Sequence, residues 1–161
     1  MKKGISLIEI LVVVTIFAVL GILATRAVLL TLRGTNRSTA TVKVRENLNY
    51  ALAVMERQLR NAQNVSPCPN TDTTTLNYTD VDGNTSSFSC QSIGPSGYVA
   101  SGSARLTSSD VGITSCSIVC AAGTGGVPDN VSISLVAKDT KNVGIESAQA
   151  TANTQIYLRT Y

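Results

Sequence analysis

The 161-residue sequence contains no histidine and no tryptophan, and only 4% of its residues are aromatic. Without histidine, the serine–histidine and cysteine–histidine pairs of nucleophilic catalysis are excluded within this sequence. Charged residues are also few, whereas serine, threonine, asparagine and glycine fill the second half. This composition predicts short strands and polar loops around a small core, and it gives no support to an enzymatic function.

Positive charge is concentrated toward the N-terminus. Residues 5–60 hold seven basic and three acidic side chains, whereas residues 61–161 hold four basic and seven acidic ones. A C-terminal part with net negative charge is a poor electrostatic partner for nucleic acid. The sequence therefore disfavours a nucleic-acid partner.

One apolar run covers residues 5–25, and its only charged side chain is Glu9. The run is long enough to cross the hydrocarbon core of a bilayer as a helix. Two lysines precede it, but two arginines lie soon after it, so charge fixes the topology only weakly. A cleaved secretory signal peptide fits poorly because no small-x-small site clearly closes the run.

The order of residues at the start of this run is distinctive. Gly4-Ile5-Ser6-Leu7-Ile8-Glu9 places a glycine, a Ser-Leu pair and an acid at the head of an apolar stretch. This order resembles the N-terminal motif of type IV pilins and type II secretion pseudopilins. Residues 105–111 and 156–161 resemble, more loosely, the larger minor pilins and pseudopilins of that family.

The resemblance implies a leader, residues 1–4, which a prepilin peptidase removes after Gly4. It also implies N-methylation of the new first residue, Ile5, where the family usually has phenylalanine. The acidic residue of the family maps to Glu9, with a role in assembly. The implied partners are the membrane, the prepilin peptidase, assembly platform proteins and other pilins or pseudopilins.

A physical argument for Glu9 stands beside the resemblance. Stacking of helices would bury this end of each subunit in surroundings of low dielectric constant. There the Glu9 carboxylate and the free α-amino group of a neighbouring subunit would neutralise each other and fix the axial register. The alternative is an ordinary membrane anchor in which Glu9 lies at the level of the lipid headgroups.

Helical periodicity continues beyond the apolar run, with residues 34–36 as its weakest point. Apolar residues at steps of four and three share one helix face: Val44, Leu48, Leu52, Met55, Leu59 and Ala62. We expect this face to pack on a sheet rather than in a coiled coil, because fewer than four heptads are present. The predicted parts are a transmembrane and assembly helix over residues 5–33, its amphipathic half over 34–64 and a head over 65–161.

The head carries signals for antiparallel strands. Residues 75–79 and 86–89 flank residues 80–84, whose Asp-Gly pair predicts a β-hairpin. Further strands are expected at residues 98–99, 111–120, 131–135 and 154–159. The predicted fold class is α+β and pilin-like, with a long N-terminal helix packed on a mostly antiparallel sheet.

All four cysteines lie in the predicted head, at Cys68, Cys90, Cys116 and Cys120. An even number beyond a membrane segment favours two disulfides in an oxidising compartment. A metal site is disfavoured because no histidine and no CxxC spacing is present. Three pairings remain open, although a Cys116–Cys120 pair needs a bulge or a strand end, since four strand residues span about 13 Å.

Two further patterns partly match known ligand sites. Asp80-x-Asp82-x-Asn84 matches the start of an EF-hand loop, but Gln91 stands where the bidentate acid is needed. The glycine-rich residues 123–126 lack the Lys-Ser/Thr pair of a phosphate loop. We therefore expect no cofactor, no metal ion and no catalytic residue.

The sequence therefore predicts a structural subunit, a minor pilin or pseudopilin of a type IV pilus or type II secretion filament. We expect one span in the cytoplasmic (inner) membrane and a head outside the cytoplasm, periplasmic or extracellular once assembled. One alternative is a tip adhesin or a DNA-uptake pilin. Another is an unprocessed single-pass membrane protein with a β-rich extracytoplasmic domain.

Overall fold

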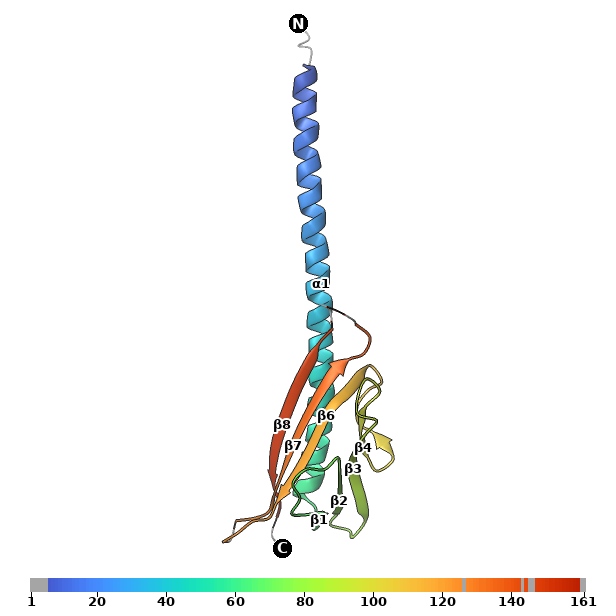
Figure 1. Cartoon of the computed structure of the whole chain (residues 1–161), viewed down its shortest axis with the longest axis vertical. Helices are drawn as coiled ribbons and strands as arrows, with labels where there is room; N and C mark the ends of the chain where they lie inside the picture. The colour runs from blue at the N-terminus through green and yellow to red at the C-terminus, as the bar shows by residue number, and fades with distance from the viewer. Residues whose placement is uncertain (1–5, 126, 143, 145–146, 160–161) are drawn as a thin grey trace. The chain divides into compact units, whose positions relative to one another are not determined.

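The computed structural model describes residues 6–125, 127–142, 144 and 147–159. The chain divides into two compact units, residues 1–36 and residues 37–161. One helix, α1, covers Leu7–Arg60 and contributes to both units (Figure 1). The strands that the structure describes all follow α1 and therefore lie in the second unit.

Helix α1 begins where the Ser6 carbonyl accepts hydrogen bonds from the amides of Glu9 at 3.0 Å and Ile10 at 3.3 Å. Leucine, isoleucine, valine and alanine dominate its first half, and a helix satisfies all backbone groups of such an apolar segment internally. The residues expected to be its weakest point, 34–36, are helical throughout. A single glycine at position 34 thus leaves the helix continuous.

Helix α1 ends at Arg60, earlier than the expected end at residue 64. The amides of Asn61 and Ala62 each donate to the carbonyl three residues back at 3.2 Å, which tightens the last turn. The Gln63 amide then donates to the Thr79 carbonyl at 2.8 Å, and strand β1, Asn64–Ser66, follows. Pairing with a neighbouring strand therefore replaces the helical bonds at this point.

The first sheet has five antiparallel strands in the order β1-β2-β3-β4-β5. Gly83 in the turn between β2 and β3 has a φ of +82°, which glycine adopts without strain. The predicted hairpin is confirmed, because Thr79 pairs with Thr85 across this turn. The strands are β2 Thr75–Thr79, β3 Thr85–Gln91, β4 Tyr98–Ser101 and β5 Ala104–Arg105.

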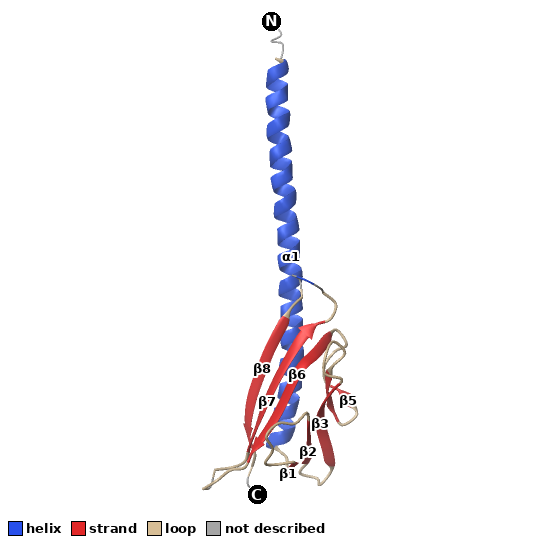
Figure 2. Ribbon diagram, in the orientation of Figure 1, coloured by secondary structure: helices blue, strands red, loops and turns tan. Residues whose placement is uncertain are grey.

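The second sheet is antiparallel in the order β6-β7-β8, with β6 Val111–Ala121, β7 Asn130–Asp139 and β8 Gln149–Tyr157 (Figure 2). The expectation of one sheet is wrong, because the strands divide into two. The last strand also begins and ends earlier than the expected residues 154–159. Pairing of Gln149 to Tyr157 with β7 sets these limits, although the first half of β8 has little strand propensity of its own.

One hydrophobic core joins the second half of α1 to both sheets. The predicted helix-face residues are all buried, at Val44, Leu48, Leu52, Met55 and Leu59, and Ala62 is buried as well although it lies beyond the end of α1. They share a cluster with Phe88 of the first sheet and Ile133 of the second. Each such side chain, when fully buried, contributes about 1.5–3 kcal/mol through removal of apolar surface from water. This core fixes the head on the α1 residues from 37 onward.

Candidate functional site

The first half of α1 exposes apolar side chains on all of its faces. Leu7 is 82% exposed, Phe17 69% and Leu30 68%, and every residue from 7 to 36 is exposed. By length and composition α1 includes one candidate membrane span, and none of the residues of that apolar window is buried. A surface of this kind requires lipid or other apolar helices around it.

The threonine hydroxyls of this segment are satisfied by the helix itself. Thr15 donates to the Val12 carbonyl at 2.8 Å, and Thr25 donates to the Gly21 carbonyl at 2.9 Å. Such bonds remove the cost of placing a hydroxyl in hydrocarbon. Glu9 is the only charged side chain of this apolar run.

Glu9 lies in the first turn of α1 and is exposed. No hydrogen bond or ion pair to its carboxylate is present among the residues that the structure describes. The positive end of the helix dipole favours a carboxylate here, by about 0.3–1 kcal/mol at an exposed site. That is less than the several kcal/mol that burial of an unpaired charge costs, so Glu9 can be buried as a charged carboxylate only beside a cationic partner.

Gly4 and Ile5, the residues predicted to be cleaved and methylated, lie outside the described residues. Glu9 belongs to the first compact unit, whereas the predicted helix-face residues belong to the second. The candidate site therefore has two separate parts. One is the apolar helix with its single acid, and the other is the head that α1 carries.

Polar contacts add to the apolar packing of α1 in the head. The Ser108 amide donates to Asn47 Oδ1 at 2.8 Å, and the Tyr78 hydroxyl donates to Gln58 Oε1 at 2.8 Å. The partners are 61 and 20 residues apart in the sequence, so no local pattern indicated them. They fix the rotation of α1 relative to the loop before β6 and to the first sheet.

Asp110 ties three segments of the head together. Its carboxylate bonds to the Lys43 ammonium from α1 and lies 2.9 Å from Lys141 Nζ beyond β7. The Asp110 carbonyl also accepts the Thr140 amide at 3.0 Å. Hydrogen bonds from Lys43 first and Lys141 second hold the pKa of Asp110 below its ordinary value.

Lowering the pH should reduce the stability of the head, because it protonates the Asp110 carboxylate. Because the pKa of Asp110 is lower in the folded chain, its contribution to stability is complete above the unfolded pKa of about 3.9 and is lost as the pH falls below that value. The Asp110→Asn variant should therefore show a flatter decline in unfolding midpoint between neutral pH and pH 3, measured by denaturant titration. Asp72→Asn, at an exposed aspartate outside this cluster, is the charge-matched control and should keep the slope of the original chain.

Both disulfides connect the first sheet, or the loop that follows β1, to β6. Cys68 pairs with Cys120 and Cys90 with Cys116, with Cα atoms 5.3 Å and 6.4 Å apart. The two predicted disulfides are thus present, and of the three pairings left open the structure has Cys68–Cys120 together with Cys90–Cys116. The local Cys116–Cys120 pair does not form, because both residues lie within β6 and each meets a cysteine from outside that strand.

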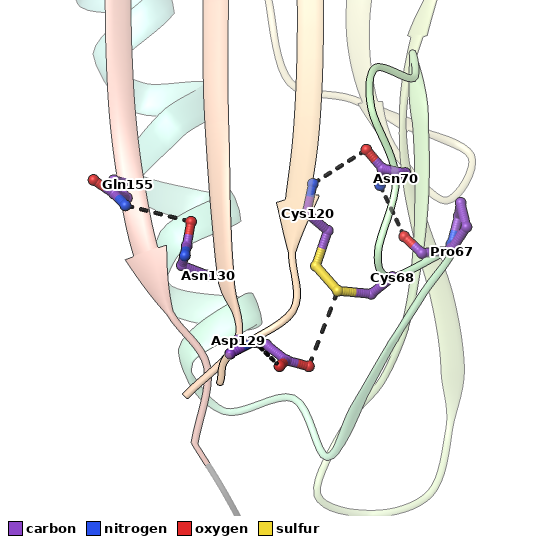
Figure 3. The surroundings of a disulfide bond; sticks show 8 residues. Pro67, Cys68, Asn70, Cys120, Asp129, Asn130 and Gln155 are labelled. Atoms are coloured by element: carbon purple, nitrogen blue, oxygen red, sulfur yellow. Dashed lines mark hydrogen bonds between the residues drawn. A yellow bond between two sulfur atoms is a disulfide. The ribbon is translucent and has the colours of Figure 1, made fainter. Parts of the chain in front are cut away.

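The surroundings of the Cys68–Cys120 disulfide hold its loop in place (Figure 3). Asn70 Oδ1 accepts the Cys120 amide at 3.1 Å, and Asn70 Nδ2 donates to the Pro67 carbonyl at 2.8 Å. Asp129 Oδ1 accepts the Gly123 amide at 2.7 Å. Its other oxygen lies 4.0 Å from Cys68 Sγ, which carries no proton in a disulfide and so makes a contact rather than a hydrogen bond.

The acid-rich turn of the β2–β3 hairpin is internally bonded. Asp80 Oδ1 accepts the amides of Asp82 and Asn84, each at 2.9 Å, and these bonds, that of Asn84 first, lower the pKa of Asp80. Within the described ranges, no three histidine, cysteine, aspartate or glutamate side chains gather as metal ligands. Asp80 therefore has a structural role in closing the turn.

Comparison of the chain with family models, with curated proteins and with solved structures finds no match. The functional inference for this chain therefore comes from its own residues: the apolar helix, Glu9 and the disulfide-linked head.

Proposed function

We propose that the chain is a structural subunit, a minor pilin or pseudopilin, of a type IV pilus or type II secretion filament. The observation that carries this proposal is the position of Glu9. It is the only charged side chain of the apolar run, it lies in the first turn of an exposed helix, and it follows Gly4 by five residues. The head motifs at residues 105–111 and 156–161 favour a minor subunit over a major one.

The exposed apolar half of α1 serves two states of such a subunit. Before assembly, lipid surrounds it and the chain is stored in the membrane with a single span. During assembly, the helices of other subunits replace the lipid, because van der Waals packing and polar contacts then drive association. The same apolar surface thus suits both storage and stacking, whereas Glu9 gains a partner only on stacking.

Glu9 sets the register of stacking in this proposal. Cleavage after Gly4 creates a free α-amino group on Ile5, and this cation on one subunit pairs with the Glu9 carboxylate of its neighbour. A buried pair of this kind adds little net stability, but a subunit in the wrong register leaves both charges unpaired at a cost of about 3–5 kcal/mol. The pair therefore selects one axial position among many that are similarly apolar.

The head lies outside the cytoplasm in this proposal. Disulfides persist in oxidising compartments such as the periplasm and the cell surface, and both cysteine pairs of the head are oxidised. The cytoplasmic side then holds the leader and the prepilin peptidase. Assembly platform proteins and other pilins or pseudopilins are the remaining partners.

Processing after Gly4 tests the proposal directly. Mature protein isolated from its native membrane should begin at Ile5 and carry one added methyl group, which mass spectrometry of the N-terminal peptide measures. A Gly4→Val variant should keep residues 1–4 and serves as the control for cleavage. Recovery of Met1-Lys2-Lys3 on the mature wild-type chain would overturn the proposal and leave an unprocessed single-pass protein.

A further inference from the structure

Two exposed arginines lie at the C-terminal end of the apolar part of α1. Arg26 and Arg33 are two helical turns apart, so they lie on one face of the helix. Among the described residues, neither guanidinium takes part in a hydrogen bond or an ion pair. From residue 10 to residue 45 the sequence contains no acidic side chain. This arginine pair, Arg26 and Arg33, therefore has no acidic neighbour along its own stretch of helix.

The residues between the two arginines are mostly apolar, and they are exposed. Val28 is 59% exposed, Leu30 68% and Leu32 56%. A mixture of exposed apolar side chains and arginine is typical of the boundary between acyl chains and headgroups. There an arginine keeps its aliphatic stem in apolar surroundings and its guanidinium near the phosphates. This stretch of α1 thus suits a membrane surface better than bulk water.

The length of the helix places that boundary at the same stretch. At an average tilt of about 20°, a helix crosses the hydrocarbon core in about 32 Å, which is about 21 residues. A span that begins at Leu7 therefore ends near residue 28, between Arg26 and Arg33. The Cα–Cβ bonds of a helix tilt toward its N-terminus, so the side chain of Arg33 extends back toward the bilayer. Both guanidiniums then lie close to the layer of lipid phosphates.

A shallow groove on α1 has Arg26 at one end. Its other lining residues are Phe17, Ala18, Gly21, Ile22 and Thr25. A Cβ at Gly21 would meet no atom within 4 Å, so the groove is open there. The Thr25 hydroxyl is already bonded to the Gly21 carbonyl, which leaves the groove largely apolar. An apolar groove that ends at a guanidinium matches the two parts of an anionic lipid, its acyl chain and its phosphate.

We propose that Arg26 and Arg33 bind the phosphate of an anionic phospholipid whose acyl chain lies in the groove at Gly21. Guanidinium groups bind phosphate through charge-assisted hydrogen bonds, often in pairs. The site requires that α1 spans a membrane, but it is independent of cleavage after Gly4 and of the stacking of helices. Failure of this proposal and failure of the proposed function are therefore distinguishable.

A lipid suits the arginine pair better than a second copy of the chain. Copies stored in one membrane lie at the same depth, so each would offer the other a stretch of helix without an acid. Two such faces in contact would bring arginine close to arginine, and this repulsion is strong in surroundings of low dielectric constant. Anionic lipids supply the missing negative charge in the same plane.

Quenching of a single tryptophan by brominated lipids tests the site. The chain has no tryptophan, and Leu29→Trp places one three residues after Arg26 and four before Arg33, next to both. The full chain is inserted into bilayers of phosphatidylglycerol and phosphatidylcholine in equal amounts, with bromine in the acyl chains of one lipid or the other. Quenching by brominated phosphatidylglycerol should be at least about twofold stronger, because the arginines concentrate anionic lipid around this part of α1.

Paired substitutions test whether the arginines cause this preference. Arg26→Gln with Arg33→Gln, in the Leu29→Trp chain, should make quenching by the two lipids equal. Arg45→Gln with Arg57→Gln removes the same charge from two exposed arginines of α1 in the second compact unit, and the preference should persist. A preference that survives the loss of Arg26 and Arg33 would overturn the proposal, as would equal quenching when both are present.

The same measurement recognises the two competing situations. Absence of quenching by either lipid would place residue 29 in water and overturn the proposal. Weak quenching by both lipids that becomes stronger when the protein is diluted in the bilayer would assign this face to a second copy of the chain instead.

Discussion

Replacing Glu9 with alanine should leave the chain in the membrane and abolish its incorporation into filaments. Insertion should persist because the change removes the only charge from the apolar run. Assembly should fail because the α-amino group of a neighbouring subunit would be buried without a partner. Breaking a buried pair costs about 3–5 kcal/mol, which lowers an association constant by at least about a hundredfold.

The two outcomes are measured separately in cells. Membrane fractionation reports insertion, and immunoblotting of sheared filaments reports incorporation. Glu9→Asp should retain part of the incorporation, since it keeps the charge, whereas Glu9→Gln should behave like the alanine variant. Thr15→Ala changes a side chain that bonds only to its own helix and should have no effect. Normal incorporation of Glu9→Ala would exclude the proposed register mechanism.

Loss of either disulfide should remove a large part of the stability of the head. In the chain-entropy model, closing the 26-residue separation of Cys90 and Cys116 contributes about 3.5 kcal/mol. Closing the 52-residue separation of Cys68 and Cys120 contributes about 4 kcal/mol. A domain of this kind is stable by only about 5–15 kcal/mol, so either loss is severe.

Paired substitutions measure these contributions. Cys90→Ala with Cys116→Ala, and Cys68→Ala with Cys120→Ala, avoid leaving an unpaired thiol or a buried hydroxyl. Urea titration followed by circular dichroism of the full chain in detergent gives the free energy of unfolding. Reduction of both disulfides in the wild-type chain should lower the free energy of unfolding by more than either paired substitution does. A loss below about 1 kcal/mol for both pairs would show that the core alone holds the two sheets together.

Sequence patterns predicted those elements of the fold that interactions between residues close in the sequence determine. The spacing of apolar residues along α1 predicted the buried face, and Asp82-Gly83 predicted the hairpin between β2 and β3. The alternation of residues 131–135 predicted the centre of β7. In each case the side chains that specify the element are close neighbours in the sequence.

Features set by distant pairing were missed or left open. Residues 149–153 are alanine or polar residues, and they form a strand because their backbone pairs with β7. The division into two sheets and the partner of Cys90 depend on where β6 lies, which no local pattern reveals. Lys43 and Asp110 are 67 residues apart and meet only in the folded head. The proposed partner of Glu9 belongs to another copy, so a single chain does not contain it.

The nesting of the two disulfides has a consequence for export. The Cys90–Cys116 pair lies within the stretch that Cys68 and Cys120 enclose. With the N-terminus held on the cytoplasmic side, as proposed, the head emerges from the membrane in chain order. Cys68 and Cys90 then reach the oxidising compartment first, and the only bond open to them is the non-native one. Correct maturation therefore requires oxidation to wait for β6, or an isomerase to correct an early bond, and a secreting cell that lacks this activity should accumulate mispaired heads.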